Sequence, residues 1–114
     1  MSSTAIINVS VLGGKALDDP TTKRVQTRGG ETTSVTTFVL KTYAGPKEPS
    51  MRIEIEAWSH LAGIVQRVTK GRRVIVTGSI LQQSWTGQDG KTQYKTFIRA
   101  TQISLLDTST DDTE

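Results

Sequence analysis

Residues 71–106 read GRRVIVTGSILQQSW (71–85), TGQDGK (86–91) and TQYKTFIRATQISLL (92–106). The two outer runs are rich in valine, isoleucine and threonine, contain no proline and flank a short polar loop. Asp89-Gly90 in that loop is a residue pair that tolerates the positive φ required by hairpin turns. The pattern therefore predicts a long β-hairpin.

The predicted hairpin carries aromatic and cationic residues close to its loop. Trp85 lies at one lip and Tyr94 at the other, and Lys91, Lys95 and Arg99 lie on the returning run. A flat ring can stack on a nucleobase while nearby cations contact phosphate, which suggests a site for single-stranded nucleic acid. The alternative for Trp85 is packing at the base of the loop or in a subunit interface.

The rest of the chain supplies three further strands, a short hairpin and one helix. Glycines 13 and 14 are expected to end the first strand, and the loop at 44–50 contains two prolines and a glycine. The expected strands are 7–11, 33–43 and 51–58, with the short hairpin over 23–31 and the helix over 59–70.

The strand expected at 51–58 alternates in character. One face is apolar and consists of Met51, Ile53, Ile55 and Ala57. The other face consists of Arg52, Glu54, Glu56 and Trp58. Trp58 on a polar face is a second candidate for base stacking, the alternative being that it covers the start of the helix.

The helix expected at 59–70 has a single apolar stripe. Leu61, Ile64, Val65 and Val68 fall at i, i+3, i+4 and i+7. Ser59 is a plausible N-cap, and Gly71 is a suitable stop.

Five main strands with a helix between the third and the fourth predict an all-β domain with one helix. The expected architecture is a five-stranded Greek-key OB-fold barrel whose last two strands form the long hairpin. Residues 1–106 would form this domain, with the first four residues frayed, and residues 107–114 a short disordered acidic tail.

Charge separates the predicted domain from the tail. Of eleven acidic residues four lie in 107–114, so residues 1–106 hold seven acids against fourteen Lys and Arg, a net charge of +7. A basic body favours an anionic partner, although such a bias also serves solubility alone.

Composition argues against several other classes of protein. The chain has no cysteine and a single histidine, His60, and it lacks a phosphate-cradling motif. We therefore expect no enzyme, no catalytic residue, no metal and no cofactor. No apolar run is long enough to span a membrane, and no signal peptide is evident. The bacterial cytoplasm, near the nucleoid, or an organelle stroma is the expected location.

Four short motifs resemble the bacterial-type single-stranded DNA-binding protein (SSB) family. They are VSVLGG (9–14) leading to DP (19–20), EAWSHLA (56–62), VTKG (68–71), and VTG (76–78) followed by WT (85–86) and DG (89–90). The resemblance implies an OB fold, sequence-independent binding of single-stranded DNA, and a homo-oligomer, more often a tetramer than a dimer.

The resemblance also assigns roles to individual positions. Trp85 and Trp58 match stacking aromatics, Arg52 stands where the family usually has another tryptophan, and Tyr43 is the nearest substitute for a further one. The full set of candidate DNA-binding residues is Trp85, Trp58, Tyr43, Arg52, Lys41, Lys47, Arg72, Arg73, Lys91, Lys95 and Arg99.

The sequence departs from the family pattern in two ways. Glu54 and Glu56 share the face of Trp58 and are expected to repel phosphate. The acidic tail lacks the apolar tip through which SSBs commonly recruit replication and repair proteins.

The function expected is protection of single-stranded DNA in replication, recombination and repair. The alternative is an SSB-like accessory protein, primosomal or a diverged paralogue, that acts mainly through protein–protein contacts and binds DNA only weakly.

Overall fold

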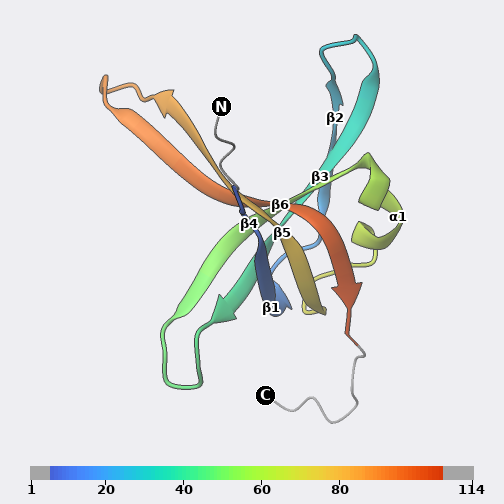
Figure 1. Ribbon diagram of the computed structural model, residues 1–114, viewed down its shortest axis with the longest axis vertical. Coiled ribbons are helices and arrows are strands. Elements are labelled where there is room, and N and C mark those ends of the chain that lie inside the picture. Colours follow the sequence, from blue (N-terminus) through green and yellow to red (C-terminus); the bar gives the residue numbers. More distant parts are fainter. Residues whose placement is uncertain (1–5, 107–114) are drawn as a thin grey trace.

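The computed structural model describes residues 6–106, and this range contains six strands and two short helical turns. The predicted frayed start and the predicted acidic tail, residues 1–4 and 107–114, lie outside the described residues. The elements are β1 (Ser10–Ala16), β2 (Thr21–Gln26), β3 (Thr32–Tyr43), β4 (Ser50–Trp58), η1 (Ser59–Leu61), α1 (Ala62–Val65), β5 (Arg73–Thr86) and β6 (Thr92–Leu105) (Figure 1).

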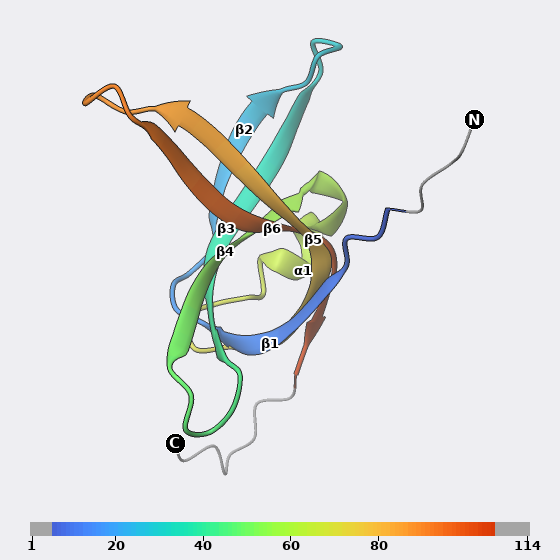
Figure 2. The same cartoon turned by 60° about the vertical axis from the view of Figure 1, so that its left-hand side comes forward.

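Five of the strands close into a ring. The sheet order is β1-β5-β6-β4-β3-β2, and β1 also pairs with β3, so that β2 extends outside the closed set. β4 and β6 pair in parallel, and the other pairs are antiparallel. Figure 2 shows the ring with β1 curving across it. This arrangement of strands is that of the predicted OB-type fold.

Two hairpin arms project from the ring on the same side (Figure 1). Both turns use one geometry: the Thr27 amide donates to the Glu31 carbonyl oxygen at 2.8 Å, as that of Gly87 does to Lys91 at 2.8 Å. Gly30 and Gly90 both have positive φ, which fits a type I turn followed by a glycine bulge. Both predicted hairpins are therefore confirmed. Within the pair Asp89-Gly90, however, only the glycine adopts positive φ.

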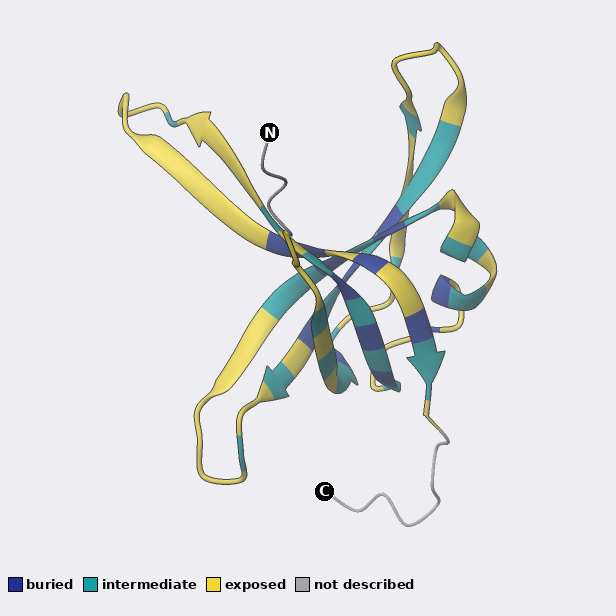
Figure 3. Ribbon diagram, viewed as in Figure 1, coloured by how far each residue is buried: buried dark blue, intermediate teal, exposed yellow. Residues whose placement is uncertain are grey.

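The core consists of buried residues on the ring strands and on and just after α1 (Figure 3). Its members are small or branched apolar residues, which suit the narrow interior of a small ring of strands. The largest fully buried apolar side chains are Leu40, Ile55, Ile98, Val65, Val68, Val74 and Val76.

The first strand differs from the prediction. It starts only at Ser10 and runs through Gly13 and Gly14 to Ala16. A Cβ on Gly14 would collide with the backbone carbonyl oxygen of Lys41. The glycine therefore permits the close approach of β1 to β3 that closes the ring, and it does not end the strand.

The helix is shorter than predicted. Instead of spanning 59–70 it consists of the η1 turn and a four-residue α1. Gly63 and the β-branched residues of this segment disfavour an α-helix, and the following amides of Arg67 and Val68 bond to carbonyls three residues back. Trp58 occupies the N-cap position and makes no side-chain capping bond, so the predicted Ser59 cap is wrong. The apolar stripe was predicted correctly, because Val65 and Val68 are fully buried.

Candidate functional site

The strand registers place the two tryptophans on one outer face of the sheet. Ile55 and Ala57 are buried inside the ring, so the alternate residues of β4 point outward, as predicted. Glu54 lies opposite Phe97 of β6, and Phe97 lies opposite Leu81 of β5. We call this surface the β4–β6 face. Its residues are Arg52, Glu54, Glu56, Trp58, Lys95, Phe97 and Arg99, continued along the β5–β6 arm by Leu81, Gln83, Trp85 and Gln93.

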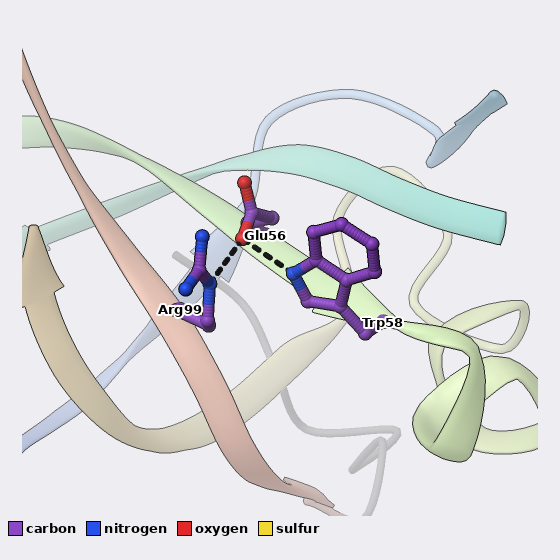
Figure 4. A network of polar contacts seen from close by, with 3 residues as sticks. All are labelled: Glu56, Trp58 and Arg99. Atoms are coloured by element: carbon purple, nitrogen blue, oxygen red, sulfur yellow. Dashed lines mark hydrogen bonds and ion pairs between the residues drawn. The ribbon is translucent and has the colours of Figure 1, made fainter. Parts of the chain in front are cut away.

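Trp58 is held in a polar network at one end of this face (Figure 4). Its indole Nε1 donates to Glu56 Oε1 at 2.6 Å, and the same carboxylate oxygen accepts from Arg99 Nε at 2.6 Å. The Arg99 guanidinium carbon also lies 5.7 Å from the centroid of the Trp58 ring, within cation–π range. The bond to Glu56 holds the half-buried ring in one orientation while part of it stays accessible.

A second ion pair lies further along the face. Lys95 Nζ is 2.8 Å from Glu54 Oε1, and both side chains are partly exposed. This pair borders a groove of about 580 Å³ at the point where β4 and β6 diverge, which Val39 and Arg52 also line. Glu54 and Glu56, which were predicted to repel phosphate, are thus each paired with a cation. The two cations, Lys95 and Arg99, were themselves predicted to bind phosphate.

Phe97 lies between these two pairs and was missed by the sequence-based prediction. It is buried, yet it does not belong to the core cluster inside the ring. Its position opposite Glu54 puts the ring on the outer face, beneath the polar residues. The alternation of β6 around buried Ile98 was the signal that could have identified it.

Trp85 lies near the end of the β5–β6 arm, away from the network around Trp58. Its side chain is about half exposed, at 48%, and its register partner is Gln93. Tyr94 pairs with Ser84 and so points to the opposite side of the arm. The two aromatics at the lips of the loop therefore do not act on one surface. Lys91 lies at the turn, where its amide donates to Asp89 Oδ1 at 3.0 Å.

Other predicted site residues gather in a different place. Lys41, Tyr43 and Arg73 line a hollow of about 680 Å³ near the closure of β1 on β3, together with Lys15 and Ile75. Lys15 is the register partner of both Lys41 and Arg73, so three cations occupy neighbouring strands.

The remaining predicted residues are separate from both places. Lys47 is in the loop between β3 and β4, and Arg72 precedes β5, its Nε buried without a hydrogen-bond partner among the described residues. Arg52 joins the two surfaces, because it lies opposite Lys41 and also borders the groove. The predicted set is thus divided between the β4–β6 face, the hollow and isolated positions.

Residues 6–106 show neither a metal site nor a helix that spans a membrane. Within this range no three His, Cys, Asp or Glu residues are grouped to hold a metal ion. The helices of the same range are too short to cross a bilayer.

Comparison with known proteins agrees with this geometry. Residues 7–106 match the model of the Single-strand binding protein family. The chain belongs to this family. Membership of a family of binding proteins confirms the expectation that the chain is not an enzyme.

Two curated relatives of this family member are bacterial. The single-stranded DNA-binding protein of Caldanaerobacter subterraneus subsp. tengcongensis is 31% identical over 108 residues, covering 90% of this chain and 69% of the relative. That of Thermus thermophilus is 26% identical over 99 residues, covering 87% of this chain. The match spans only 37% of the length of the Thermus protein.

A solved structure shares the fold. The SSB of Plasmodium falciparum in complex with ssDNA superposes with a TM-score of 0.71 at 21% identity, covering 94% of this chain and all of the other.

Proposed function

We propose that this protein binds single-stranded DNA without sequence preference on the β4–β6 face. The observation that carries the proposal is the placement of Trp58 and Trp85 on one outer sheet face with Lys95 and Arg99 between them. Aromatic rings stack on any base, and cations meet the phosphates between bases, so this arrangement suits a ligand defined by its backbone. The names of the relatives and of the solved complex support the same ligand.

The bound strand would follow a path over several elements. It would pass from Trp85 on the arm across Phe97 and Trp58, while the groove beside Arg52 leads toward the hollow with Lys41 and Tyr43. Lys47, Lys91, Arg72 and Arg73 would also contribute to the positive electrostatic potential that attracts the strand. The net charge of +7 over residues 1–106 supports this role.

We propose further that the chain forms a homo-oligomer, and we favour a tetramer over a dimer. Large apolar residues are exposed along and before β1 and on the adjoining part of β5, a pattern that marks interaction surfaces. They are Ile6, Ile7, Val9, Val11 and Ile80. Asn8 fixes part of this segment against β5, since its side-chain amide and carbonyl bond the backbone of Ile80 at 2.8 and 2.9 Å.

In the cell this binding would protect single-stranded DNA during replication, recombination and repair. Residues 1–106 would form the binding domain and 107–114 an acidic tail. The proposed setting is the bacterial cytoplasm near the nucleoid or an organelle stroma.

A fluorescence titration with oligo-dT tests the binding. Stacking should quench tryptophan emission, and the affinity should fall with rising salt because phosphate contacts release counterions. Absence of quenching at low salt would reject the proposal. Light scattering with and without oligo-dT gives the mass of the assembly, and a monomeric mass would reject the oligomer.

A further inference from the structure

The β4–β6 face contains its own anions. Glu54 and Glu56 lie among the aromatic rings, and each carboxylate is bonded to a cation of β6 at 2.8 and 2.6 Å. The Lys95 and Arg99 side chains remain 43% and 47% exposed, so a ligand can reach both. The carboxylates are more covered than their cations, at 31% and 17%.

A phosphate that approaches either cation meets a competitor. The phosphate must either displace the carboxylate from the cation or share the cation with it. A displaced carboxylate loses its partner, and a shared cation leaves two anions close together, so binding is opposed in both cases. A cation neutralised beforehand also contributes less to the number of phosphates neutralised, which sets the salt dependence of the affinity.

We propose that Glu54 and Glu56 limit the affinity of this face for single-stranded DNA by occupying Lys95 and Arg99. Binding at these two positions is then an exchange of carboxylate for phosphate. The inference rests on the proposed function, and it identifies the acidic residues of β4 as determinants of binding strength.

Glu56 has a second role as a positioning residue. The oxygen that binds Arg99 also accepts the Trp58 indole hydrogen, so the carboxylate orients the ring against which a base would stack. Removing the charge and removing the acceptor therefore have different effects. Glu56→Gln keeps an oxygen that can accept from the indole, whereas Glu56→Ala does not.

The experiment compares oligo-dT binding by the unmodified chain, Glu54→Gln, Glu56→Gln and the double variant at several salt concentrations. Each substitution should tighten binding about two- to fivefold, the range that follows from the strength of exposed ion pairs. The slope of log K against log salt should steepen by about 0.7 for each released cation. Glu31→Gln, in the turn of the other arm, is the matched control for net charge.

Equal affinity and slope in the double variant and the unmodified chain would overturn the proposal, as would an equal gain in Glu31→Gln. Thermal melts monitored by circular dichroism establish that the variants are folded. Binding by the unmodified chain tests the proposed function separately, because the inference depends on the ratio of variant to unmodified affinity. If the chain fails to bind and the double variant binds, the proposed function is wrong and the inference stands. If neither binds, both are rejected.

The positioning role is tested in a Trp85→Phe background, where Trp58 is the sole tryptophan. Adding Glu56→Gln to this background should change the Trp58 emission of the free protein less than Glu56→Ala does, because the indole keeps its acceptor. Adding Glu56→Ala instead should shift the emission. An identical spectrum for Glu56→Gln and Glu56→Ala would overturn the positioning role.

Discussion

The two tryptophans of the β4–β6 face differ in how the fold holds them. Trp58 lies over the ring of strands, where Glu56 accepts its indole hydrogen and Arg99 packs over its face. Trp85 lies on the β5–β6 arm, about half exposed, and within residues 6–106 its indole forms no hydrogen bond to another side chain or backbone group. One ring is fixed before a ligand arrives, and the other is free to adapt to it.

This difference separates two contributions to binding. A fixed ring loses little conformational entropy when a base stacks on it. Neighbouring side chains already cover part of that ring, however, so less of its surface is left for the base. A free ring offers more area and must be ordered by the ligand.

The largest effect is expected from Trp85→Ala. Loss of a stacking ring on the exposed arm should weaken oligo-dT binding by about 1–3 kcal/mol. A titration read from the remaining tryptophan measures this loss, with Tyr94→Ala as the control on the opposite side of the arm. Unchanged affinity in Trp85→Ala would mean that the arm does not contact the strand.

Trp58→Ala should have a smaller effect, about 1 kcal/mol, at the low end of the stacking range. Its ring is half-covered, and the pair of Glu56 with Arg99 persists without it. Trp58→Phe, which retains a ring and loses the indole hydrogen, should fall between Trp58→Ala and the unmodified chain. Oligo-dT titrations of these variants measure the losses, and a larger loss for Trp58→Ala than for Trp85→Ala would reverse the proposed ranking of the two sites.

The smallest effect concerns the cations beside the two rings. Lys91→Gln, at the turn of the arm, should reduce the salt slope of binding by about 0.7, the full value for one phosphate contact on a single strand. Lys95→Gln should reduce it by less, because Glu54 already neutralises that lysine at 2.8 Å. Salt titrations of both variants measure the difference, and equal reductions would contradict the role given to Glu54.

The sequence predicted the parts of the fold that depend on local patterns. Alternation in β4 correctly separated Ile55 and Ala57 from Glu56 and Trp58, and the glycine-containing turns correctly located both hairpins. Glycine was misread at 13 and 14, because the role of Gly14 is an approach to β3, which a local pattern does not reveal.

The ion pairs of the site could not be predicted for a related reason. Glu56 and Arg99 are 43 positions apart, and they meet only because β4 and β6 pair in parallel with one particular register. The sequence alone therefore presented Glu54 and Glu56 as isolated repulsive charges. The structure shows them as partners of the cations on the neighbouring strand.

The double pairing of β1 has a consequence for the order in which the protein folds. During synthesis β2 can pair with β3, and β3 with β4, as each next strand emerges, whereas the main partner of β1 is β5, which follows much later in the chain. Contacts of such high sequence separation form late and slowly. Leu12, which pairs with Val76 and packs against the core in the finished fold, is therefore without its β5 neighbour until most of the chain has been made. We expect a nascent chain halted before β5 to expose this apolar surface and to aggregate more readily than the complete chain.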